Sequence, residues 1–105
     1  MATIKVNPGI CGLLSTFTIQ ADDEQMVSIK IRSDCPHVLA MQAELVDLDG
    51  YAECFSNILD STIYKVANDY IRHIACPVPA AIIKGMEVAC GLALPKDVEI
   101  GISND

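Results

Sequence analysis

The sequence predicts an α+β protein in which a small antiparallel sheet is covered on one face by helices. Two observations support this class. The first third of the chain alternates apolar and polar residues with period two, which indicates half-buried strands. From residue 36 onward, apolar residues recur at helical spacing, which indicates amphipathic helices. Three strands are therefore expected first, then the helices, then a last strand, as in an antiparallel sheet with one covered face.

Three parts of the chain are expected to form the sheet. Ile4 and Val6 share one face of an N-terminal strand. A hairpin follows over about residues 14–33, with its turn at the acidic residues 22–25. The last strand is expected over residues 98–102, where apolar and polar residues alternate again.

The middle of the chain predicts four helices. The first three have an apolar stripe or a capping residue, and the last ends at Gly91, in keeping with glycine's role just past helix ends. The expected helices cover residues 35–47, residues 51–57, a longer stretch capped by Ser61 or Asp60 with an apolar face reaching Ile74, and Ala80–Cys90.

Length and composition define the class of protein. The 105 residues are enough for one domain, residues 1–105, and the 51% hydrophobic fraction is enough for one core. A net charge of −7 argues against binding to nucleic acid or to anionic lipid, because both require a basic surface.

The N-terminus and the cysteine content predict a cytoplasmic protein. Residues 1–6 lack the basic and apolar regions of a signal peptide, and no apolar run has the length of a membrane span. In the cytoplasm thiols stay reduced, so the five cysteines indicate metal binding, catalysis or core packing more than disulfides.

Cys35 and Cys76 share a sequence context. Each is followed by proline, and each stands where an irregular stretch leads into a helix. The unpaired amides and the dipole at a helix start favour thiolate over thiol. For Cys76, this argument requires the helix to begin at Pro77 rather than Ala80.

A third cysteine and two histidines complete the candidate metal site. Cys11 lies in a glycine-containing loop, which allows close approach to another group. His37 follows Cys35 by two residues, and His73 precedes Cys76 by three. Thiolate and imidazole ligands suit zinc, and thiolates also hold iron–sulfur clusters. The predicted ligands of zinc or of a cluster are therefore Cys11, Cys35, Cys76, His73 and His37.

Two other interpretations remain open at this stage. Cys76 or Cys35 could serve as the nucleophile of a thiol enzyme, although a non-enzymatic role is favoured. The chain could instead be a protein-interaction module without site chemistry. Cys54 and Cys90 fall on the apolar faces of predicted helices, so we expect both to pack in the core.

The order of the three site cysteines resembles the iron–sulfur cluster assembly scaffold family (IscU and the N-terminal domain of NifU). Cys11-Gly12 precedes a hairpin with an acidic turn, Cys35 follows the hairpin at a helix start, and Cys76 with His73 precedes a later helix. The resemblance covers about residues 2–91, but Leu13 stands where that family has aspartate. It implies a cluster-binding α+β fold and, as partners, other iron–sulfur assembly proteins.

Overall fold

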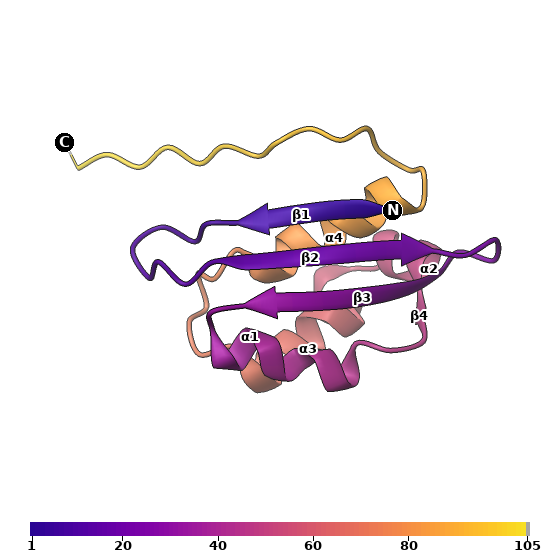
Figure 1. Ribbon diagram of the computed structural model, residues 1–105, viewed down its shortest axis with the longest axis horizontal. Helices are drawn as coiled ribbons and strands as arrows, with labels where there is room; N and C mark the ends of the chain where they lie inside the picture. Colours follow the sequence, from indigo (N-terminus) through magenta and orange to yellow (C-terminus); the bar gives the residue numbers. More distant parts are fainter. Residues whose placement is uncertain (105) are drawn as a thin grey trace.

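The computed structural model describes residues 1–104 as one antiparallel sheet with helices packed against it (Figure 1). The strands lie in the order β1-β2-β3-β4. This confirms the predicted α+β class. The elements in chain order are β1 (Ala2–Val6), β2 (Ser15–Ala21), β3 (Met26–Ser33), α1 (Pro36–Ala40), the 3-10 helix η1 (Met41–Glu44), β4 (Leu48–Asp49), α2 (Gly50–Cys54), the 3-10 helix η2 (Ile58–Asp60), α3 (Thr62–Tyr70) and α4 (Val78–Ala89).

Strands β2 and β3 form the predicted hairpin. Phe17 faces Ile31 and Ile19 faces Ile29 across the ladder, and these side chains are buried. The turn is closed by Asp22, whose Oδ1 accepts hydrogen bonds from the backbone N–H groups of residues 24 and 26, both at 2.9 Å. The alternation of apolar and polar residues along β2 and β3 therefore corresponds to a strand pair with one buried face.

The helices cover only one face of the sheet. α4 packs across β1 and β2, while α1 and η1 pack on β3. α4 can approach closely because it carries Gly85, where a side chain would meet the ends of Ile4 and Ile19. The opposite face is mostly polar and uncovered; its side chains include Thr3, Lys5, Thr16, Thr18, Gln20, Ser28, Lys30, Arg32 and Asp49.

The single helix predicted over residues 35–47 is wrong beyond Ala40. The chain tightens into η1 and leaves the helix at Leu45, whose ψ is 65°, and Asp47 then turns the chain with a positive φ of 53°. This turn lets Leu48 pair with Val27 at the edge of β3, forming the short strand β4. Gln42 supports the same edge farther along, since its amide bonds the backbone N–H of Ile31 at 2.7 Å and the carbonyl of Ile29 at 2.6 Å.

α3 has the predicted N-cap but a shorter length. The hydroxyl of Ser61 accepts a hydrogen bond from the Tyr64 N–H at 3.3 Å, and the Glu53 carboxylate accepts one from the Thr62 N–H at 2.9 Å. The helix ends at Tyr70, because Ile71 turns to extended backbone and packs against the core. Ile74, which was expected on the buried face, is fully exposed.

α4 begins at Val78, two residues earlier than expected, and is followed by Gly91 at a φ of 75°. It has 12 residues. Among the residues that the structure describes, no helix has the length and apolar character needed to cross a membrane.

The predicted C-terminal strand is absent from the described part of the chain. Residues 94–104 form neither helix nor strand, and all of them are exposed. The segment leaves the end of α4 and runs past the sheet on the side of β1 (Figure 1). Alternation shows that a segment has two different faces, but it does not show whether a partner lies beside it.

Candidate metal site

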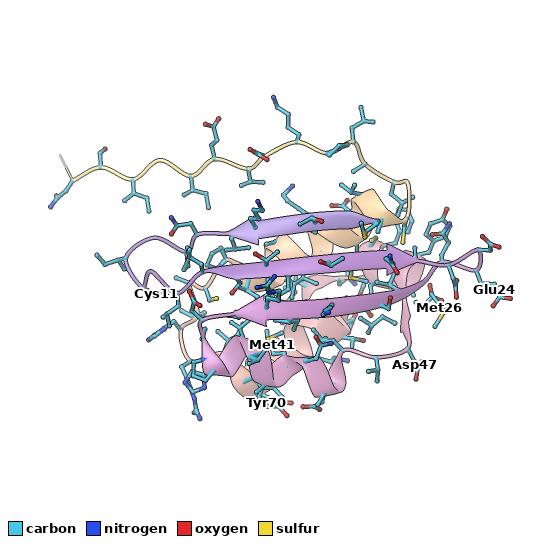
Figure 2. All side chains as sticks on the ribbon, viewed as in Figure 1. Cys11, Glu24, Met26, Met41, Asp47 and Tyr70 are labelled. Carbon is cyan, nitrogen blue, oxygen red and sulfur yellow. The ribbon has the colours of Figure 1, made fainter. Side chains whose placement is uncertain are left out.

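Three connections bring Cys11, Cys35 and Cys76 to the same end of the molecule. Cys11 lies in the β1–β2 loop, Cys35 directly follows β3, and Cys76 precedes α4. The first two connections are neighbours because the backbone N–H of Asp34 bonds the carbonyl of Leu14 at 2.9 Å. Figure 2 shows Cys11 at this end, far from the hairpin turn at Glu24. We call this region the three-cysteine end.

Cys35 is the N-cap of α1, as predicted. Its backbone is extended, Pro36 takes the first helical position, and its side chain makes no capping hydrogen bond. The N–H of Cys35 donates to the hydroxyl oxygen of Ser33 at 3.0 Å, and that oxygen also lies 2.7 Å from the hydroxyl of Ser15. The half-buried sulfur is thus held next to the end of the sheet without a local hydrogen bond of its own.

Cys76 lies at the start of α4. The backbone N–H of Val78, the first residue of the helix, donates a hydrogen bond to its sulfur, which lowers the pKa of the thiol. Burial raises that pKa by more, and the charges of Cys35 and Cys11 raise it further, so the net pKa is above the usual value. The helix start favours thiolate as expected, but it does not outweigh burial. The effect of the other two sulfurs means that Cys76 lies within electrostatic reach of both Cys35 and Cys11.

Cys11 is the most accessible of the three. Its loop contains Gly9 and Gly12 at φ values of 91° and 69°, and the Gly12 N–H bonds the Gly9 carbonyl at 3.0 Å. The sulfur accepts a weak hydrogen bond from the N–H of Leu13 at 3.5 Å. A side chain added at either glycine would meet nothing within 4 Å, so there is open space beside the loop at both positions.

Neither histidine forms a metal-binding cluster with the three cysteines in the described residues. His37 lies in α1 and His73 in the turn before Cys76, and both side chains are exposed. Within residues 1–104, no three His, Cys, Asp or Glu side chains are gathered closely enough to hold a metal ion. The ligand set of three cysteines and a histidine therefore stays a prediction.

Exposed apolar side chains surround the three-cysteine end, a feature that sequence reasoning missed. Ile10 and Ile74 are fully exposed, and Leu13 and Leu14 are 40% and 51% exposed. All four lie in the connections that carry Cys11 and Cys76. The sequence did contain a signal for this surface, namely isoleucine and leucine within loops that contain proline or glycine. Large apolar residues in such loops usually belong to a core or to a contact surface.

Cys54 and Cys90 lie at the opposite end, near the hairpin turn. Cys90 is only 6% exposed and packs in the core, and the half-buried Cys54 of α2 packs against it. Burial is the main cause that raises the pKa of Cys54 to about 11, with further contributions from Cys90, Glu87 and Glu53. Both positions confirm the expected packing role.

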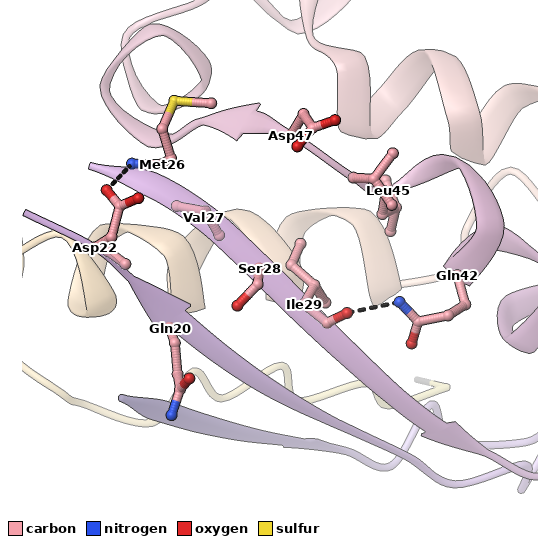
Figure 3. A pocket seen from close by; sticks show the side chains of 11 residues that line it. Gln20, Asp22, Met26, Val27, Ser28, Ile29, Gln42, Leu45 and Asp47 are labelled. Carbon is pink, nitrogen blue, oxygen red and sulfur yellow. Dashed lines mark hydrogen bonds between the residues drawn. The ribbon is translucent and has the colours of Figure 1, made fainter. Parts of the chain in front are cut away.

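A hollow beside the hairpin carries little chemistry. It has a volume of about 480 Å³ and lies between the hairpin and the segment around Leu45 (Figure 3). Among its lining residues the carboxylates belong to Asp22, which is engaged in the hairpin turn, and Asp47. No cysteine or histidine lines it, so it does not compete with the three-cysteine end as a metal site.

The fold and the candidate site define a small α+β protein with a cysteine-lined end. The chain belongs to the family described as a family of unknown function (DUF6951), which matches residues 2–102. This match corrects the resemblance to the iron–sulfur cluster assembly scaffolds, which was wrong because cysteine order and loop context recur without common descent. No curated protein and no solved structure matches the chain.

Proposed function

We propose that the chain binds a thiophilic metal, as a zinc ion or an iron–sulfur cluster, through Cys11, Cys35 and Cys76. The convergence of three cysteines from three separate connections at one end of the sheet is the observation that supports this proposal. Thiolates are the preferred ligands of zinc and of iron–sulfur clusters in reduced compartments. A cytoplasmic location belongs to the same proposal, because free thiols persist there.

Binding requires the Cys11 loop to move toward the other two sulfurs, since the three are not yet gathered around one point. The loop is suited to this movement because its glycines face open space. A bound cation would also reverse the electrostatic effect on the Cys76 thiol. The charges of Cys35 and Cys11 now raise its pKa, whereas a cation would stabilise all three thiolates together. A fourth ligand would come from His73, in the turn before Cys76, or from His37 in α1, since both side chains are exposed.

The thiol-enzyme interpretation gains no support from the geometry. A nucleophilic cysteine needs a lowered pKa or an adjacent base. The pKa of Cys76 is raised, and the nearby His73 side chain is exposed. An ordinary thiol at this position is therefore a poor nucleophile at neutral pH.

The decisive experiment measures zinc, iron and acid-labile sulfide in protein purified without oxygen. We expect close to one zinc per chain without sulfide, or iron with sulfide and visible absorption. Cys76→Ser should lose most of this metal, whereas the matched control Cys54→Ser, at the opposite end, should keep it. Metal-free protein that takes up no zinc or iron on reconstitution would contradict the proposal. Equal metal content in the two variants would contradict the assigned site.

A further inference from the structure

The C-terminal segment has the pattern of a strand but no strand partner. Val98, Ile100 and Ile102 are 56%, 72% and 91% exposed, and they alternate with Asp97 and Glu99. In an extended chain, these two sets point to opposite sides. Apolar side chains placed on one side of an extended segment are typical of a strand that packs against a core. We call residues 94–102 the C-terminal segment.

β1 provides an open edge for such a strand. It pairs with β2 from Ala2 to Val6, and within the described residues no strand lies on its other side. Ile4 faces the core but remains partly exposed, although its cross-strand neighbour Phe17 is completely buried. Ala2–Val6 contains no proline and no bulge, and its one charged residue is Lys5.

Chain direction favours a partner from a second copy. The C-terminal segment runs in the same direction as β1 of its own chain (Figure 1). Pairing within the chain would therefore be parallel, which is the less stable arrangement for each residue. A two-fold axis perpendicular to the strands makes the segment of one copy antiparallel to β1 of the other. The nine residues span about 30 Å when extended, which is more than the five residues of β1 require.

Charge supports the same pairing. Lys5 of β1 lies on the polar face of the sheet together with Lys30 and Arg32. Among the strand residues of that face, the one acidic side chain is Asp49 of β4, which lies at the opposite edge of the sheet. When Val98 and its apolar neighbours turn toward the helices, the acidic residues of the segment turn toward Lys5. Opposite charges on adjacent strands stabilise their pairing. In a chain with a net charge of −7, this is a favourable surface for an acidic segment.

We propose that two copies of the chain exchange their C-terminal segments, so that residues 94–102 of each copy add to the β1 edge of the other as an antiparallel strand. The contact is self-complementary, because each copy supplies one segment and one edge. It extends each sheet by one strand and covers Ile4 together with the three exposed apolar side chains of the segment. The exchange does not depend on metal binding.

The test compares two neighbouring positions with the same substitution. Ile100→Ser removes an apolar side chain from the side that would face the helices, and Glu99→Ser changes the opposite side. Both residues are exposed in the isolated chain, so the fold of each variant should be retained, as a circular dichroism melt would check. Sedimentation equilibrium in the presence of a chelator gives the dissociation constant of the dimer and excludes metal-bridged pairs.

We expect the wild-type chain to dimerise and Ile100→Ser to raise the dissociation constant by about tenfold or more, because the side chain is lost from both symmetric contacts. Glu99→Ser should raise it only a few-fold. Hydrogen exchange should show concentration-dependent protection of β1 and of residues 97–102. A monomer at all concentrations, with the segment either unprotected or protected against its own β1, would overturn the proposal. A dimer that Ile100→Ser leaves unchanged would overturn it as well.

Discussion

The two ends of the sheet hold cysteines in opposite ways. Near the hairpin turn, Cys90 packs beside Gly50, where no room remains for even one added carbon. At the three-cysteine end, Cys11 stands in an exposed loop, and the glycines beside it face open space. The same side chain is thus a core residue at one end and a potential ligand at the other.

The difference follows from where each sulfur lies along its secondary-structure element. Cys54 belongs to a helix and Cys90 directly follows one, so the periodicity of these helices turns both sulfurs toward the core. Cys35 and Cys76 stand where an extended chain becomes helical, and backbone amides there have no helical partner. A sulfur at such a junction keeps access to solvent and to other connections.

Alkylation rates provide the largest expected contrast between the two ends. With a pKa of about 11, only about one thousandth of Cys54 is thiolate at pH 8, so it should react about a hundredfold more slowly than an unperturbed thiol of pKa 9. Its rate should rise tenfold for each pH unit until about pH 11. Cys11 should be modified first, because its side chain is exposed. Mass spectrometry of peptides after iodoacetamide pulses measures both.

The result would contradict the comparison if Cys54 reacted as fast as Cys11 in the metal-free protein at pH 8.

The raised pKa of Cys54 also has a consequence for stability. The unfolded chain ionises this thiol at lower pH than the folded chain, so the free energy of unfolding should fall as pH rises from 9 through 11. The variant Cys54→Ala should lose less stability over this range.

Substitution of Gly50 should show how tightly the Cys90 end is packed. An added methyl group would meet the Cys90 sulfur, Val27 and the carbonyl of Gln25, so Gly50→Ala should lower the free energy of unfolding by about 1–3 kcal/mol. Urea denaturation measures this change. Gly101→Ala, in open space, is the matched control and should change stability by less than about 0.5 kcal/mol.

A double substitution tests whether contact with the Cys90 sulfur causes the stability loss of Gly50→Ala. Cys90→Ala removes the sulfur that the new methyl group would meet, so the Gly50→Ala/Cys90→Ala pair should cost less than the sum of its single changes. Additive losses would show that the strain comes from contact with Val27 or the carbonyl of Gln25 and not from contact with the sulfur.

Much of the fold was predictable because it depends on local patterns. The β2–β3 hairpin, the Ser61 cap and the Cys35 cap each follow from a few adjacent residues. The predictions failed where distant contacts decide the structure. β4 forms because Leu48 pairs with Val27, whereas residues 94–104 form no strand with any described part of the chain. Neither outcome is encoded in the alternation or spacing of its own residues.

For the candidate site, the sequence predicted which cysteines lie at the same end of the molecule, but not the pKa of their thiols. Helix starts and proline marked Cys35 and Cys76, and the structure brings them within reach of Cys11. The balance that sets the pKa of Cys76 was not predictable, because burial depends on the core that packs around it. Family membership was equally out of reach, since the order of three cysteines carries too little information to identify common ancestry.

The smallest expected contrast compares two cysteine-to-serine changes in metal-free protein. Cys90→Ser places a hydroxyl among buried apolar side chains and should cost about 1–3 kcal/mol of unfolding free energy. Cys76→Ser should cost less than about 1 kcal/mol, because the Val78 N–H that bonds the sulfur can donate to the smaller hydroxyl oxygen. Urea denaturation in the presence of a chelator measures both. Equal losses of unfolding free energy would mean that the two ends pack their sulfurs alike. A larger loss for Cys76→Ser that occurs only when metal is present would show that this sulfur takes part in metal binding.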